Sequence, residues 1–369
     1  MAGVGNGLQH GGFVTLDGKL SGHTTSSLIG AQALAAGDAT PDLLGATSGV
    51  GGNRSVHDVA TASPRLWNWD RLRVLSFLDI GAFHMAGQYL FLGVGLPIFL
   101  LLRFALASRL PAPESTRTFI HVRVEKLLVP WAAWSLIFVF LKLATGLRHG
   151  TPILEWVNPR MILYGPEAHL WFLPFAAVVG IAVHFIDVVT QRVPTRAFLV
   201  AFGTSGVAAI WITQAAEGHL EVPFQQWVFG LPAVPLGLGM GRVLARPWAD
   251  VRGVWISVLA ASAVAIGFSV IQRAPGAPVV TAPLRYALAM ALISGGAVAT
   301  NLPGRWTGIL TPLLLGGYLL QKVVYMQTAA RLERRAGIEI SLPILVLITV
   351  PLCLLLVAAL RRTRLRAIL

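Results

Sequence analysis

The residues with the clearest chemical potential are an arginine and a histidine eleven positions apart in one apolar stretch. The stretch runs from Trp69 to Arg109 and contains Arg73 and His84. In an α-helix, eleven residues make three turns plus about 20°, so both side chains share one face, about 16 Å apart along the axis. Asp70, three residues before Arg73, lies close to the same stripe. Because ionisable side chains are costly within a membrane, we interpret this face as a catalytic track carried by Arg73 and His84.

The alternative for this face is structural. Arg73 is also a typical anchor whose long side chain extends to the membrane surface, and His84 is also a typical interfacial histidine. The spacing alone leaves both interpretations open.

Composition places these residues in a membrane protein. The chain has 369 residues, of which 55% are apolar and 12% charged, with a mean hydropathy of +0.69. The formal net charge of +13 is compatible with nucleic-acid binding. However, the basic residues lie in short loops between apolar runs, as membrane anchoring requires. We therefore expect membrane lipids, and not nucleic acid, to surround the protein.

Apolar runs near twenty residues predict the elements that position these side chains. We expect an all-α, polytopic integral membrane bundle with about ten transmembrane helices, the first two joined by a turn at Gly87 and Gln88. The predicted spans cover about 72–89, 90–108, 127–145, 169–189, 197–216, 224–243, 253–272, 283–300, 306–326 and 341–360.

The remaining segments predict domain limits and orientation. Residues 1–64 are rich in Gly, Ser, Thr and Ala and predict a flexible cytoplasmic tail, whereas 65–362 form the transmembrane domain and 363–369 a short basic cytoplasmic tail. Lys and Arg are biased toward the segments that lie inside if the amino terminus is inside. We therefore expect a multi-pass protein of the inner or plasma membrane with both termini cytoplasmic.

A second candidate group is basic and lies between the second and third spans. It contains Arg109, Arg117, Arg123 and Lys126. Arg123 and Lys126 are three residues apart, and are neighbours if the segment is helical. Such a group can hold the phosphates of a nucleotide-like donor, so we predict Arg117, Arg123 and Lys126 as donor-binding residues. Anchoring at the cytoplasmic face explains the same residues without a ligand.

A third candidate is the motif EAHLWFLPF, which begins at Glu167 at the outer start of the fourth span. We predict that Glu167, His169 and Trp171, together with Asp70 of the first span, bind substrate. Trp171 also fits an aromatic residue at the membrane interface. The chain contains no zinc motif, phosphate-binding loop or serine-nucleophile motif, so we predict no metal and no permanently bound cofactor.

Taken together, these motifs resemble the acyltransferase 3 family of integral membrane acyltransferases. The family has a D-x-L-R start and then an Arg, ten residues and a His in the first span, which here are WDRLR, Arg73 and His84. Its second span opens like Gly93 to Phe99. Its third span begins with a basic stretch, Leu-Pro and an aromatic, and its H-L-W-F-L motif is unaltered. The matching residues of the last two motifs are Arg123, Lys126, Leu128, Val129, Pro130, Trp131 and His169 to Leu173.

The resemblance implies a membrane O-acyltransferase. Its donor would be acyl-CoA, often acetyl-CoA, as a co-substrate from the cytoplasm, and its acceptor a hydroxyl of a glycan, a glycolipid or another lipid-linked or related metabolite. His84 would act as the general base, and Arg73 would position the donor or stabilise negative charge.

Two departures from the family pattern keep alternatives open. Leu101 to Phe104 replace the Ser-Gly of the second span, and Gln321 stands where the late Y-L-x-H-Q-P motif has its His. A catalytically inactive family member is one alternative. A multi-span transporter or flippase without chemistry is the other, because polar residues and Gly or Pro breaks within spans also suit a substrate path.

Overall fold

The computed structural model describes residues 67–86, 89–107, 115–150, 161–271, 281–299, 304–336 and 341–369, and these ranges contain helices and no strand. The predicted tail 1–64 and the predicted turn at Gly87 and Gln88 lie outside these ranges. The α-helices are α2 (Trp67–Ala86), α3 (Gly95–Ala107), α4 (Thr116–Arg123), α5 (Val129–His149), α7 (Met161–Tyr164), α8 (Phe172–Thr190), α9 (Thr195–Ala216), α10 (Phe224–Gly230), α11 (Ala233–Leu244), α12 (Trp248–Ile271), α13 (Ala282–Val298), α14 (Arg305–Leu310), α15 (Leu314–Ala336) and α16 (Leu342–Leu360). A π-helical turn, η1 (Val124–Leu128), joins α4 to α5, and three 3₁₀ turns are η2 (Ala168–Trp171), η3 (Thr311–Leu313) and η4 (Arg364–Ile368).

The predicted all-α membrane architecture is confirmed, but the count of about ten spans is not. Within the described ranges, seven helical runs are long and apolar enough to cross a membrane. The helix α3 has 13 residues, and its rise of about 20 Å falls short of a hydrocarbon core of about 30 Å. The helix α13 is also short, with 17 residues, and α2 carries four charged side chains. The seven runs are Thr116–Arg148, His169–Thr190, Thr195–Ala216, Phe224–Leu244, Val251–Ile271, Trp306–Thr328 and Leu342–Leu360.

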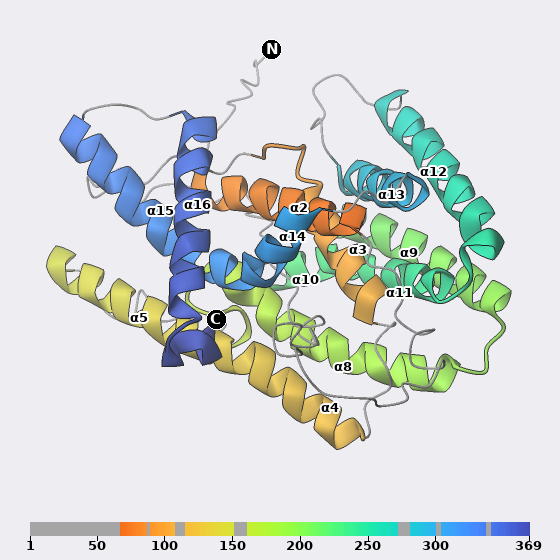
Figure 1. The fold of residues 1–369 in the computed structure, drawn as a ribbon, viewed down its shortest axis with the longest axis horizontal. Coiled ribbons are helices and arrows are strands. Elements are labelled where there is room, and N and C mark those ends of the chain that lie inside the picture. Colours follow the sequence, from red (N-terminus) through yellow and green to blue (C-terminus); the bar gives the residue numbers. More distant parts are fainter. Residues whose placement is uncertain are drawn as a thin grey trace, which may run out of the picture.

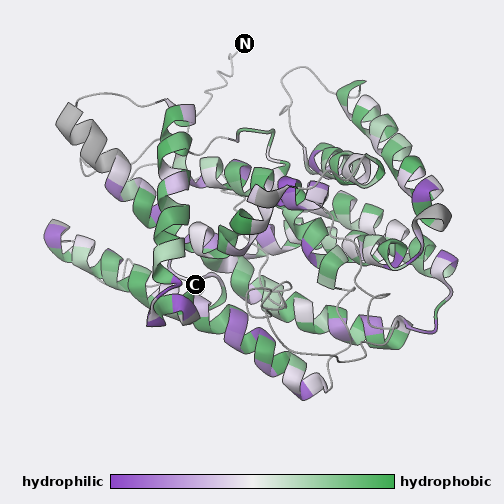
Figure 2. Cartoon of the chain, in the orientation of Figure 1, coloured by the Kyte–Doolittle hydropathy of each residue, from purple (hydrophilic) through white to green (hydrophobic). Residues whose placement is uncertain are grey.

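The outer helices expose large apolar side chains. In Figure 2 the helices α12 and α16 are hydrophobic over most of their length, and hydrophilic residues gather near several helix ends. Phe140 on α5 is 71% exposed, Leu347 on α16 is 72% exposed and Val264 on α12 is 73% exposed. An apolar surface of this kind matches contact with lipid tails rather than with water.

The interior of the bundle is built around α2 and α3, which lie near its centre in Figure 1. The helix α2 packs against α3, α13, α14, α15 and α16. The helix α3 is buried from Gly95 to Ala105 and packs against α11 on another side. Gly237 permits that contact, because a Cβ on it would lie 2.7 Å from the Cβ of Phe104. The core is therefore formed by α2, which is charged, and α3, which is short. By hydropathy and length these two helices are the least clear membrane spans.

One carboxylate joins α2 to α3. Asp79 on α2 accepts hydrogen bonds from the backbone N–H of Phe91 at 2.7 Å and of Gly95 at 2.8 Å. The N–H of Gly95 belongs to the first turn of α3, where a helix leaves its donors unsatisfied. Asp79 therefore caps a neighbouring helix and holds the connecting loop, in which Leu92 and Gly93 have φ values of 56° and 71°.

The carboxyl-terminal segment, predicted as a basic tail, contacts the bundle. It forms η4, and its Ile368 carbonyl accepts a hydrogen bond of 2.8 Å from the indole Nε1 of Trp134 on α5.

The Asp79 contact requires a residue without a side chain at Gly95. A Cβ there would lie 2.8 Å from both the Ser76 carbonyl oxygen and the Asp79 Cβ. We expect Gly95→Ala to lower the free energy of unfolding by about 1–3 kcal/mol through overpacking. Thermal unfolding in detergent measures this change. The matched control is Gly253→Ala on α12, where nothing lies within 4 Å of the added Cβ. It should be neutral or slightly stabilising, and equal unfolding midpoints for both variants would contradict the close packing of α2 on α3.

Candidate functional site

Three aromatic side chains from distant parts of the chain meet at the end of α2. The ring of His84 on α2 lies 5.6 Å from that of His169 in η2 and 5.7 Å from that of Tyr318 on α15, measured between centroids. The rings of His169 and Tyr318 are 5.4 Å apart. The structure thus brings together two predicted site residues, His84 and His169, that lie far apart in the sequence.

The two histidines differ in accessibility. His84 is half-buried, whereas His169 is 1% exposed and its Nε2 has no hydrogen-bond partner among the described residues. The position of η2 is fixed by the Tyr318 hydroxyl, which donates to the backbone carbonyl of His169, and by the edge of Phe138 at 5.2 Å from the His169 ring. His84 is therefore the more accessible of the two imidazoles, and His169 packs behind it.

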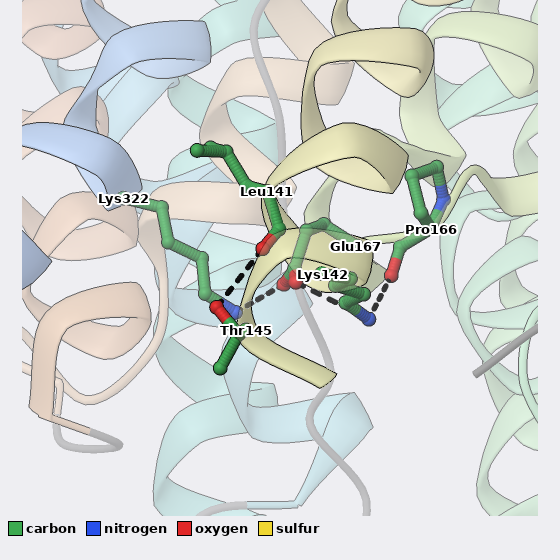
Figure 3. Close-up of polar contacts among 6 residues, drawn as sticks. All are labelled: Leu141, Lys142, Thr145, Pro166, Glu167 and Lys322. Carbon is green, nitrogen blue, oxygen red and sulfur yellow. Dashed lines mark hydrogen bonds and ion pairs between the residues drawn. The ribbon is translucent and has the colours of Figure 1, made fainter. Parts of the chain in front are cut away.

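A bridging carboxylate lies two residues before His169. Glu167 forms one ion pair with Lys142 of α5, at 3.3 Å, and another with Lys322 of α15. Figure 3 shows both ammonium groups turned toward Glu167, and Lys142 also donates to the carbonyl of Pro166. The charges of Lys142 and Lys322 also act on His169. This group of three side chains ties α5 and α15 to η2, and its two ammonium groups outnumber its one carboxylate.

A second group of charges, here called the buried cationic cluster, combines the buried Arg103 and Arg123 with the half-buried Arg73. Arg103 on α3 is 3% exposed, its Nη1 has no partner among the described residues, and the charges of Arg123 and Arg73 act on it. Arg123 is 7% exposed and lies over the ring of Phe119, facing Gly180 of α8. Asp70, at 3.2 Å from Arg73, supplies one balancing charge. The buried guanidinium groups of Arg103 and Arg123 favour a ligand that brings negative charge.

The other predicted donor-binding residues lie outside this cluster. Arg117 and Lys126 are exposed on the same continuous helix that buries Arg123. Arg123 and Lys126 are close in sequence, as predicted, but Arg123 faces the interior while Lys126 does not. Surface anchoring therefore accounts for Lys126 and Arg117 more readily than for Arg123.

Trp171 is part of the core. It is fully buried and packs against Phe175, with ring centroids 5.3 Å apart. A tryptophan at the membrane–water interface would keep its polar edge accessible, so the interfacial interpretation does not fit. The predicted role of Trp171 in substrate binding stays a prediction.

The sequence alone did not assign several residues to the site. Arg103 interrupts the apolar run LLLRFALA, where a charge already indicates a functional residue, but no binding role followed from the sequence. Tyr318 begins the segment compared with the late Y-L-x-H-Q-P motif, but its contact with His84 depends on packing of α15, as the positions of Lys322 and Lys142 depend on packing of α15 and α5. Among the described residues, no group of three or more His, Cys, Asp or Glu side chains is placed to hold a metal ion.

A known protein family matches most of the chain. A model of the acyltransferase 3 family, described as an acyltransferase domain, matches residues 60–362. The chain belongs to the acyltransferase 3 family. No curated protein and no solved structure matches the chain significantly. The matched range contains all three groups of site residues, so the resemblance predicted from the motifs is confirmed for most of the chain.

The bridging role of Glu167 predicts a pairwise effect on stability. The variant Glu167→Gln leaves two lysines facing each other without a counter-charge, and should lower the free energy of unfolding by about 1–3 kcal/mol, because breaking a partly buried pair leaves uncompensated charge. The double variant Glu167→Gln/Lys322→Met removes one of the repelling charges and should be more stable than Glu167→Gln alone. Thermal unfolding of the four members of this double-mutant cycle measures the coupling. If the effects of the two substitutions on the free energy of unfolding are additive, the Glu167–Lys322 ion pair contributes nothing to stability.

Proposed function

We propose that this protein is a membrane O-acyltransferase that moves an acyl group from acyl-CoA, with acetyl-CoA the first donor to test, to a hydroxyl of a glycan, glycolipid or related metabolite. The observation that carries the proposal is the position of His84. It is an accessible imidazole at one end of α2, it contacts His169 and Tyr318, and it shares its helix with Arg73 of the buried cationic cluster. Membership of an acyltransferase family supports the reaction class.

In this mechanism His84 accepts the proton of the acceptor hydroxyl while the hydroxyl oxygen attacks the thioester carbonyl carbon. The tetrahedral intermediate then collapses, the carbon–sulfur bond breaks, and the proton on His84 passes to the leaving CoA thiolate. The products are an ester and free CoA thiol, so the reaction balances without an external oxidant or reductant. Residues packed behind His84, above all His169 and Tyr318, hold the ring in place.

The buried cationic cluster suits the phosphates of the donor. Arg73 and His84 lie on one helix about 16 Å apart, a length comparable to a pantetheine arm. Phosphates bound by Arg103 and Arg123 would leave the thioester within reach of His84, with Arg73 along the arm. Guanidinium groups bind phosphate oxygens through paired charge-assisted hydrogen bonds. Arg117 and Lys126, exposed on the same helix as Arg123, are then available to the nucleotide end.

The orientation belongs to the same proposal. The bias of Lys and Arg favours cytoplasmic termini, which puts the cationic cluster toward the cytoplasm and the Glu167 group toward the outer side of an inner or plasma membrane. An acyl-CoA from the cytoplasm would enter at the cluster, and the acceptor would reach His84 from the other side.

The direct test of the function is the loss of the base. In purified protein supplied with acetyl-CoA and a glycan acceptor, release of CoA thiol measures turnover. We expect His84→Ala to lower kcat by at least about 100-fold with little change in the donor KM, because the base acts in the transition state. The exposed His219 provides the matched control, since His219→Ala should retain wild-type turnover. Turnover by the wild type excludes a pure transporter, and unchanged turnover in His84→Ala would remove His84 from the mechanism.

The cationic cluster predicts a different kinetic change. We expect Arg103→Met and Arg123→Met each to raise the donor KM by about tenfold, since a charge-assisted contact contributes about 1.5–3 kcal/mol to binding. Arg103→Met should not lower the unfolding midpoint without donor, because it removes like-charge repulsion. The exposed Arg196 is the control, and Arg196→Ala should leave the donor KM unchanged. Unaltered donor KM in both cluster variants, with only reduced yield, would assign the arginines to anchoring.

A further inference from the structure

Gln321 is a buried side chain whose amide is unsatisfied. It lies on α15, is 2% exposed, and neither its Nε2 nor its Oε1 has a hydrogen-bond partner among the described residues. Within the described part of the chain it is the one side chain with two fully buried atoms in this condition. Burying an amide without hydrogen bonds is costly, so a purely structural role would be better served by leucine or methionine.

Gln321 lies close to the candidate site around His84. Gln321 follows Tyr318 by three residues on α15, which places both on one helix face. Tyr318 contacts His84. The Gln321 Oε1 lies beside α2, 3.1 Å from the position that a Cβ on Gly81 would occupy, and Gly81 precedes His84 by three residues. The amide therefore lies about one turn from the His84 contact along each of the two packed helices.

The chemistry of a carboxamide indicates what it binds. Its oxygen accepts hydrogen bonds and its nitrogen donates two, side by side in one plane. Two hydroxyls on adjacent carbons match this arrangement, because one hydroxyl donates to the oxygen while the other accepts from the nitrogen. A glutamine side chain is not an acid–base group in water, so it takes no proton from the acceptor and its function is recognition.

We propose that Gln321 is a specificity-determining residue that binds a pair of neighbouring hydroxyls on a sugar acceptor, and so presents a further hydroxyl of that sugar to His84. This inference rests on the proposed function. It narrows the acceptor from any hydroxyl compound to one with a vicinal diol. The side chain satisfies its amide only when the acceptor is bound, which explains a polar group that lowers the stability of the free protein.

The test combines Gln321→Leu with acceptors that lack single hydroxyls. The probes are p-nitrophenyl glycosides of common hexoses and their monodeoxy analogues, with acetyl-CoA as donor. For the wild type, removal of a recognised hydroxyl should lower the acceptor kcat/KM by about tenfold, which is the effect of one hydrogen bond to a buried group left unpaired. In Gln321→Leu the same removal should have no further effect, while the donor KM stays unchanged.

Stability separates recognition from a structural role. We expect the unfolding midpoint of Gln321→Leu to equal or exceed that of the wild type, because an unpaired buried amide is replaced by an apolar group. A second variant, Gly81→Ala, presses on the Gln321 oxygen and should raise the acceptor KM without changing the donor KM. The matched control is Gln225→Leu on α10, another buried glutamine with an amide nitrogen that lacks a partner among the described residues. It should keep the wild-type discrimination among deoxy sugars.

The possible negative results distinguish an error in the role of Gln321 from an error in the proposed acyltransferase function. Discrimination among deoxy sugars that persists in Gln321→Leu, or a lowered unfolding midpoint together with loss of donor binding, would overturn the role of Gln321 alone. Transfer to a membrane lipid extract but to none of the glycosides would also overturn it and leave the acyltransferase function standing. Absence of CoA release by the wild type with every acceptor would overturn the proposed function and this inference with it.

Discussion

The bundle depends on the contact between the Asp79 carboxylate and the backbone at the start of α3. A charged group within a helix bundle is costly unless donors surround it, and the loop from Phe91 to Gly95 supplies two backbone N–H groups at short distance. The contact satisfies the carboxylate and the open end of α3 at once. It holds α2 against α3 at a spacing that only glycine allows at position 95. Because Arg73 and His84 both lie on α2, this contact also sets where their helix lies relative to α3.

Charge within the bundle is separated into two groups of unlike character. Around Glu167 the two ammonium groups share one carboxylate, and the ion pairs serve to position η2. Around Arg103 two guanidinium groups are buried in the bundle, and a third, that of Arg73, is paired with Asp70. Low polarity strengthens attraction and repulsion alike. The first group therefore suits structural support, and the second suits a ligand that brings negative charge.

The sequence predicted the helical membrane architecture well, because long apolar runs have few other stable forms. It also predicted that Arg73 and His84 lie on one helix, since their spacing is a property of the helix itself. It did not predict that His84 would meet His169 or Tyr318, because such contacts depend on the packing of α2, η2 and α15. The sequence also did not predict that Arg123 is buried while Lys126 is exposed, because a local pattern does not show which side of a helix faces a neighbouring helix. The number of spans was not confirmed because α3 and α13 are short and α2 carries four charged side chains.

The π-helical turn η1, directly after Arg123, has a consequence for how this protein can change. The run from Thr116 to Arg148 is one continuous helix, and a π turn accommodates one residue more than regular α-helical winding. Each residue added to an α-helix rotates the rest of that helix by about 100°. Such a turn lets Arg123 face α8 while Trp134 and Phe138, further along, are also buried. Loss of that one extra residue from Val124–Leu128 would restore a regular helix and keep both faces in phase, whereas a further inserted residue wound as α-helix would rotate everything after it by about 100°. Related chains that share both faces should therefore carry either this π turn or a regular helix that is shorter by one residue.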